Sequence, residues 1–145
     1  MKRIFFFYLI TAISLLANAQ EDVVTWTTNF NSKTSELEIH ANLSPGWHIF
    51  SQYLDDDLGP VATNFLFEKN SNYLLIDSVS EPKAIHKLDP NFETQVYFFE
   101  EQVIFKQKIK AIQPTILSGI VTYMACNEFQ CIPPTDEKFT ITITK

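Results

Sequence analysis

The sequence is poor in the residues that build metal sites and tight catalytic loops. It has two cysteines, three glycines and three histidines among 145 residues. A site built from His40, His48 and His86 together with the cysteines would need three separate segments to converge, so we expect no metal site. No Gly-x-Ser-x-Gly, His-Glu-x-x-His or phosphate-binding loop occurs. Hydrolase functions are therefore without support.

Positive charge is also scarce. Eleven Lys and Arg stand against 17 Asp and Glu, which gives a formal net charge of −6. The only basic cluster is Lys106, Lys108 and Lys110, which alternate along one face of an expected strand and are typical of a solvated face. We therefore expect neither nucleic acid nor an anionic membrane as a partner. The run Asp55-Asp56-Asp57 lacks the spaced oxygens and the glycine of a calcium loop and is expected to be solvated.

Only one long apolar run occurs, at residues 4–16, after Lys2 and Arg3 and before a small-x-small pattern at residues 17–19. These are the parts of a signal peptide, with cleavage expected between Ala19 and Gln20. Gln20 stands where a lipoprotein would have cysteine, and no later stretch reaches the roughly 18 apolar residues that span a bilayer. We expect a product in the bacterial periplasm, without membrane insertion after cleavage.

Residues 20–145 are long enough for one domain with a substantial core. Loss of Lys2 and Arg3 changes the formal charge from −6 to −8. Apolar residues alternate with polar ones, as in residues 36–43, and no segment has a sustained helical period. Strands are expected at residues 23–28, 36–43, 47–50, 64–68, 73–78, 96–99, 103–109, 120–123 and 139–144. The pattern predicts an all-β protein, an immunoglobulin-like antiparallel β-sandwich in a single domain, which we expect to be a monomer.

Two stretches do not fit a strand, residues 51–63 and 81–94. Long loops on a sandwich often carry binding sites. The second contains Phe92, an isolated aromatic residue among polar neighbours. Phe92 is either an exposed functional cap or a side chain pinned under its own loop, and we favour the cap.

Both cysteines, Cys126 and Cys131, lie shortly before Pro133-Pro134. In an exported protein such a pair is either a structural disulfide or a redox couple. Closing a loop of about six residues stabilises by only ~2 kcal/mol in the chain-entropy model, against nearly ~5 kcal/mol for about 100 residues. The usual immunoglobulin disulfide joins strands distant in sequence, and this pair does not. On the residues alone, both roles stay open.

The surroundings of the cysteines shape the redox alternative. The two prolines forbid the helix that lowers a thiol pKa behind a C-x-x-C motif, and the nearest charge, Glu128, disfavours a thiolate. The pair therefore fits electron shuttling better than initiating attack. A partner's thiolate opens the disulfide, and the dithiol is later spent on another disulfide. Such a couple needs shielding between partners, which Phe92 could provide.

Several motifs together resemble a known family. They are residues 46–50 (Gly-Trp-His-Ile-Phe), 89–92, 119–123 (Gly-Ile-Val-Thr-Tyr), 126–131 and 132–134 (Ile-Pro-Pro). In this order they are similar to the N-terminal periplasmic domain of the thiol:disulfide interchange protein DsbD. The resemblance spans nearly all of residues 20–145, and its most specific part is Tyr-x-x-Cys…Cys-x-Pro-Pro.

The resemblance implies a protein-disulfide reductase, that is, a thiol:disulfide oxidoreductase module with a redox-active disulfide and no other cofactor. Such domains receive electrons from a thioredoxin-like domain. They pass them to periplasmic disulfide isomerases or to thioredoxin-like proteins of cytochrome c maturation. By the same resemblance, Cys131 forms the mixed disulfide with a partner and Cys126 is the resolving thiol.

The resemblance also assigns the surroundings of the pair. Phe92 is the tip of a cap loop with Asp89 at its base, and His48, Phe50 and Tyr123 flank the disulfide. The sequence departs from the best-known members by one residue fewer between the cysteines and by Pro90-Asn91 in the cap loop, where an acidic residue is common. No membrane-embedded conduit or terminal thioredoxin-like domain follows before Lys145, so we expect the electron donor to act in trans.

The alternative function is a non-catalytic secreted β-sandwich that binds a protein or peptide and carries a local structural disulfide. The two functions differ in one consequence. A thioredoxin reduces the disulfide of an exchange module readily and the domain stays folded, whereas a structural disulfide resists reduction or costs stability when lost.

Overall fold

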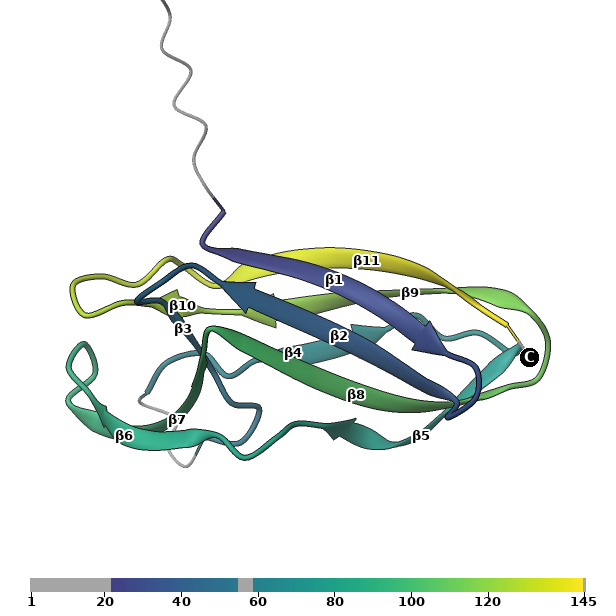
Figure 1. The fold of residues 1–145 in the computed structure, drawn as a ribbon, viewed down its shortest axis with the longest axis horizontal. Helices are drawn as coiled ribbons and strands as arrows, with labels where there is room; N and C mark the ends of the chain where they lie inside the picture. The colour runs from purple at the N-terminus through teal and green to yellow at the C-terminus, as the bar shows by residue number, and fades with distance from the viewer. Residues whose placement is uncertain (1–21, 55–58, 145) are drawn as a thin grey trace, which may run out of the picture.

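The computed structural model describes residues 22–54 and 59–144 (Figure 1). Every regular element within these residues is a β-strand, and all strand pairs are antiparallel. The all-β antiparallel prediction is confirmed. The strands are β1 Val24–Asn31, β2 Glu36–Leu43, β3 His48–Phe50, β4 Asn64–Phe67, β5 Tyr73–Ser80, β6 Ile85–Asp89, β7 Thr94–Glu100, β8 Gln102–Ala111, β9 Thr115–Tyr123, β10 Ala125–Cys126 and β11 Thr135–Ile143.

The strands form three sheets, with the orders β1-β2-β8-β5, β11-β9-β4 and β10-β3-β7-β6. Figure 1 shows the first sheet in front of the second, and the third sheet at one end of the molecule. Two chain segments pass between sheets almost without a loop. β7 continues into β8 through Glu101, which has a positive φ of 60°, and β9 continues into β10 through Met124.

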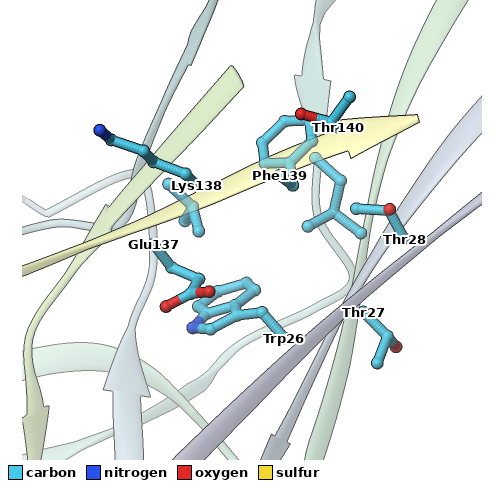
Figure 2. A pocket seen from close by; sticks show the side chains of 9 residues that line it. Trp26, Thr27, Thr28, Glu137, Lys138, Phe139 and Thr140 are labelled. Carbon is cyan, nitrogen blue, oxygen red and sulfur yellow. The ribbon is translucent and has the colours of Figure 1, made fainter. Parts of the chain in front are cut away.

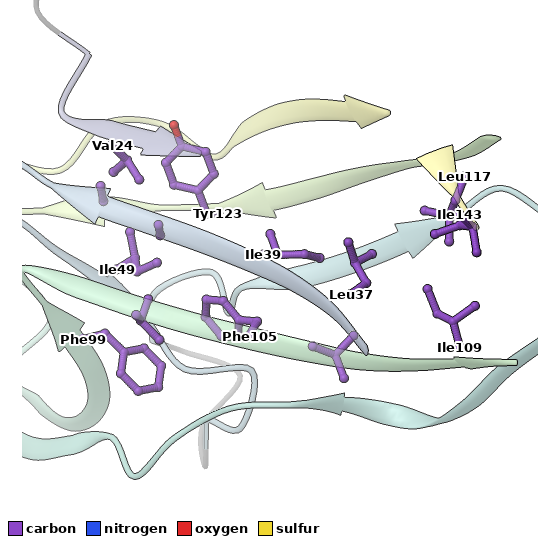
Figure 3. Packing of buried hydrophobic residues seen from close by; sticks show 14 of the residues in the cluster. Val24, Leu37, Ile39, Ile49, Phe99, Phe105, Ile109, Leu117, Tyr123 and Ile143 are labelled. Atoms are coloured by element: carbon purple, nitrogen blue, oxygen red, sulfur yellow. The ribbon is translucent and has the colours of Figure 1, made fainter. Parts of the chain in front are cut away.

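The period-two pattern of the sequence places the main core. In β2, Leu37, Ile39 and Ala41 are fully buried. They belong to a core cluster that also contains residues of the β11-β9-β4 sheet (Figure 3). The alternate residues point outward. Glu38, for example, lies 3.3 Å from the Lys106 ammonium on the neighbouring strand β8, and the hydrogen bond to Lys106 lowers the pKa of that carboxyl. Lys108 and Lys110 are exposed on the same face, as predicted.

The expectation that residues 81–94 form one long irregular loop is wrong. This stretch contains β6, which pairs with β7 over Ile85 to Asp89. β6 is the edge strand of its sheet, and only Asp89 in it is buried, so it has no apolar alternation for the sequence pattern to reveal. The two-residue strand β10 was also missed, because it is too short to show a period.

Some predictions fall on residues outside the described ranges. These are the signal peptide over residues 1–19 and the solvated loop at Asp55-Asp56-Asp57. Within residues 22–54 and 59–144, no helix is long and apolar enough to cross a membrane.

Candidate functional site

The cysteines lie on the outer face of the β10-β3-β7-β6 sheet. Alternation along the strands sorts the side chains between two clusters: Ile49, Phe99 and Ala125 join the main core, whereas their sequence neighbours face the other way. We call the outer group the disulfide cluster. It consists of the buried residues Phe50, Val96, Phe98 and Cys126, against which Leu54, Phe92, Met124 and Cys131 pack.

Cys126 and Cys131 are joined by a disulfide, with their Cα atoms 4.0 Å apart. The two partners differ in access, because Cys126 is fully buried whereas Cys131 is partly exposed. Two backbone hydrogen bonds close the intervening loop, from Asn127 N–H to the Gln130 carbonyl (2.9 Å) and from Ile132 N–H to the Ala125 carbonyl (2.8 Å). Thiol-disulfide exchange requires approach to one sulfur, and Cys131 is the less buried of the two cysteines.

The predicted cap is the turn of the β6–β7 hairpin. Residues 90–93 connect the paired residues Asp89 and Thr94, and Glu93 takes a positive φ of 55° to close the turn. The ring of Phe92 is half-buried and meets Phe50 edge to face, with ring centroids 6.1 Å apart. The turn therefore places Phe92 against the disulfide cluster.

A hydrogen bond ties the cap to the loop that carries the cysteines. The Asn91 side-chain amide donates to the Asn127 carbonyl at 2.9 Å. Asn127 also organises its own loop, because its side-chain oxygen accepts the backbone N–H groups of Phe129 and Gln130, both at 2.9 Å. This link could not be predicted from the sequence, since a contact between residues 36 positions apart leaves no local pattern.

His48 and Asp89 meet beneath the cap. The His48 Nε2 atom lies 3.1 Å from Asp89 Oδ2, and both residues are buried, at 8% and 2% exposure. The other carboxylate oxygen, Oδ1, accepts the backbone N–H groups of Asn91 (2.8 Å) and Phe92 (3.3 Å). In the β3–β10 ladder, His48 stands directly opposite Cys126.

The His48 ring packs against two phenylalanine rings of the disulfide cluster. Its centroid lies 5.1 Å from that of Phe50 and 4.8 Å from that of Phe98. The structure thus brings together six of the seven predicted site residues: Cys126, Cys131, Asp89, Phe92, His48 and Phe50. Phe98 was not predicted as a site residue, although its place in an alternating strand was.

The seventh predicted residue, Tyr123, lies in the main core. Its ring packs against Trp26 with centroids 5.2 Å apart, and burial raises the pKa of its phenol. A small cavity of about 160 Å³ opens beside Trp26, between the edge strands β1 and β11 (Figure 2). The buried indole nitrogen of Trp26 has no hydrogen-bond partner among the described residues.

A larger groove of about 530 Å³ opens beside the cap, on the outer face of the sheet. His48, Asp89 and Phe98 are among its lining residues, so the groove reaches the His48–Asp89 pair. Two exposed apolar side chains line it, Leu88 at 54% exposure and Phe129 at 88%. Lys87, Glu100 and Glu128 also line it. We call this feature the Leu88–Phe129 groove.

The described residues bring together no group of three or more His, Cys, Asp or Glu side chains that could hold a metal ion. This face carries a disulfide between a fully buried cysteine and a partly exposed one, and Phe92 packs against the same cluster. Fold and site together define an antiparallel β-sandwich with a disulfide at one end and the β6–β7 turn packed beside it.

The family model described as "Thiol:disulfide interchange protein DsbD, N-terminal" matches residues 16–143. The chain belongs to this family, as the sequence resemblance predicted. Domains of the family are immunoglobulin-like, which confirms the predicted fold class. The comparison with curated proteins gives no match.

Solved structures agree in fold. The reduced N-terminal domain of DsbD from Neisseria meningitidis superimposes with a TM-score of 0.64 at 16% identity, over 86% of this chain and 89% of that one. The same domain in complex with the N-terminal domain of PilB gives 0.62 at 12% identity, over 83% and 84%. The N-terminal periplasmic domain of ScsB from Proteus mirabilis gives 0.54 at 22% identity, over 81% of this chain and 44% of that one.

Proposed function

We propose that this protein is a periplasmic thiol-disulfide exchange module that relays electrons through the Cys126–Cys131 pair. The observation that carries the proposal is the unequal burial of the two cysteines, with Cys126 fully buried in the disulfide cluster and Cys131 partly exposed at its edge. Membership of the DsbD N-terminal family supports thiol-disulfide exchange as the chemistry. A thioredoxin-like partner is supported by the Neisseria domain, which was solved in complex with the N-terminal domain of PilB.

The proposed cycle has two halves. A thiolate of a thioredoxin-like donor, acting in trans, attacks the Cys131 sulfur; the Cys126–Cys131 bond breaks, and Cys126 leaves as a thiolate that takes up a proton. The second donor thiolate then attacks the donor sulfur of the mixed disulfide, which releases Cys131 and leaves the donor oxidised. Two electrons have moved to this domain.

In the second half, the Cys131 thiolate attacks the disulfide of an acceptor. Cys126 loses its proton and attacks Cys131, which reforms the Cys126–Cys131 bond and releases the acceptor as a dithiol. We propose a periplasmic disulfide isomerase or a thioredoxin-like protein of cytochrome c maturation as the acceptor. The cycle makes the domain a protein-disulfide reductase that needs no group besides its own disulfide. Phe92 acts as the cap that shields the pair between encounters.

A redox titration tests this function against the structural alternative. We expect the signal-cleaved protein, equilibrated with a thioredoxin-like protein, to show a potential within the range of exchange proteins, roughly −120 to −270 mV. Reduction should cost at most about 2 kcal/mol, because the bond closes a short loop in a sandwich held by long strand ladders. Thermal melting of both redox states measures that cost. A potential below about −300 mV, or melting on reduction, would show a structural disulfide instead.

We expect the Leu88–Phe129 groove to take part in binding a partner. Phe129 is two positions from Cys131 and 88% exposed, so we expect a protein bonded to Cys131 to lie against it. Burying such a side chain contributes about 1.5–3 kcal/mol. Phe129→Ala should therefore lower the second-order rate constant with a thioredoxin-like partner about tenfold. The rate with dithiothreitol should not change.

The matched control is Leu66→Ala, which removes a side chain of 64% exposure from β4, in a different sheet. It should leave both rates unchanged. Equal loss in the two variants, or a parallel loss with dithiothreitol, would remove the groove from the docking surface.

A further inference from the structure

We propose that the buried His48–Asp89 pair is a latch that holds the cap closed over the disulfide. His48 and Asp89 are positioning residues in this proposal, since they act on access to the sulfurs through the cap. The biological use of the latch rests on the proposed exchange function. Its physical action, the control of access to the Cys126–Cys131 bond, does not.

Asp89 joins the cap to the sheet through its two carboxylate oxygens. Oδ1 accepts the N–H groups of Asn91 and Phe92, so it fixes the turn that forms the cap. Oδ2 lies 3.1 Å from His48 Nε2, on a strand two positions away in the sheet. The carboxylate thus connects the backbone of the cap directly to β3.

Because Asp89 is buried, the loss of only one of its hydrogen-bond partners costs free energy. Asp89 is 2% exposed, and a buried carboxylate that loses one partner keeps the desolvation cost without the compensating hydrogen bond. If His48 no longer holds Oδ2, Asp89 can regain a partner only from water, which requires the hairpin turn to lift. The closed position of Phe92 therefore depends on the imidazole of His48, which lies on β3 and not in the turn.

The position of His48 aligns the latch with the disulfide. His48 stands opposite Cys126 in the β3–β10 ladder, and its ring packs on Phe50, which also contacts Phe92. A latch anchored here places the cap relative to the sulfurs themselves. Both latch residues also line the Leu88–Phe129 groove, so the latch is within reach of anything bound there.

The test is the rate at which dithiothreitol reduces the disulfide of the signal-cleaved protein, followed by quenching and mass spectrometry. His48→Phe keeps an aromatic ring against Phe50 and Phe98 but removes the ring nitrogens. Asp89→Ser keeps an oxygen near the turn amides but is too short to reach His48. Each variant should be reduced about tenfold faster, the change expected for one lost charge-assisted hydrogen bond.

A double variant of His48 and Asp89 distinguishes the loss of one shared contact from two independent defects. The double variant should be reduced no faster than the faster single variant, because both substitutions break the same contact. In a Phe92→Ala background, neither substitution should raise the rate further, since no cap remains to be held. Asp89→Asn retains an acceptor for the turn and a hydrogen-bonding group for His48, and should restore slow reduction. Additive effects, or an effect that persists without Phe92, would overturn the latch.

Thermal melting of the oxidised variants serves as the control for general loosening of the fold. Asp89→Ser leaves the aromatic rings around His48 unchanged, so it decides the question even if their packing does not tolerate His48→Phe. An unchanged reduction rate in a folded Asp89→Ser protein would also reject the proposal. Because dithiothreitol needs no docking surface, failure of this test is distinct from failure of the exchange function, which the redox titration reports.

Discussion

Cys131→Ala should abolish mixed-disulfide formation with a partner, whereas Cys126→Ala should trap the partner on Cys131. The reason is geometric. Cys126 is fully buried in the disulfide cluster, while Cys131 is partly exposed at its edge. With Cys126 present, the second thiol resolves the adduct; without it, the bond between Cys131 and the partner persists.

The experiment needs a partner that cannot resolve the adduct itself. A thioredoxin-like domain with a single active-site cysteine, activated as its thionitrobenzoate disulfide, meets this requirement. The Cys126→Ala protein should release thionitrobenzoate and form an adduct that is stable without reductant and visible by mass spectrometry. The Cys131→Ala protein should do neither above background. An adduct on Cys126 in the Cys131→Ala protein would reverse the assigned roles.

The two single variants control for each other. Both lack the disulfide and one sulfur atom, so both should melt close to the reduced parent protein. A difference in trapping between them then reports which sulfur is reachable. Reactivity of both variants at similar rates would mean that the buried position of Cys126 opens on the timescale of exchange, and the cap would not control access.

Most of the fold could be predicted from the sequence because it follows from local alternation. Residues 36–43 alternate because one face of β2 is buried in the core and the other meets solvent. β6 failed the same test for a physical reason: four of its five residues are exposed, so no alternating burial constrains its sequence. Its strand character comes from pairing with β7, which is not encoded in β6 itself.

The site residues could likewise be predicted only where a local pattern in the sequence marks them. The two cysteines are only five positions apart and could be found in the sequence, as could Phe92 through its isolation among polar residues. The contact between His48 and Asp89 joins residues 41 positions apart. It exists because β3 lies between β10 and β7 in the sheet, with β6 beyond β7. That order depends on the whole fold, and no local pattern states it. Tyr123 was assigned to the disulfide by resemblance, and the structure places it in the main core beside Trp26.

Phe92→Ala should make the disulfide more accessible to small thiols, with reduction by dithiothreitol on the order of tenfold faster. The substitution removes the edge-to-face contact with Phe50, and such aromatic pairs contribute about 0.5–1.5 kcal/mol beyond the apolar area that they bury. Phe92 is only half-buried at the end of a hairpin, so its loss should affect cover more than global stability. Stopped-flow reduction and thermal melting of the oxidised protein measure the two effects separately.

Phe129→Ala provides the contrast that makes this result specific. Both variants remove one phenylalanine from the same end of the molecule, yet Phe92 packs on the disulfide cluster while Phe129 projects into solvent. Phe92→Ala should therefore speed reaction with small thiols, and Phe129→Ala should slow only the reaction with a protein partner. An unchanged dithiothreitol rate in Phe92→Ala would mean that its ring does not limit access to Cys131. The shielding would then come from the partial burial of Cys131 in its own loop, and the cap would have to be assigned another role.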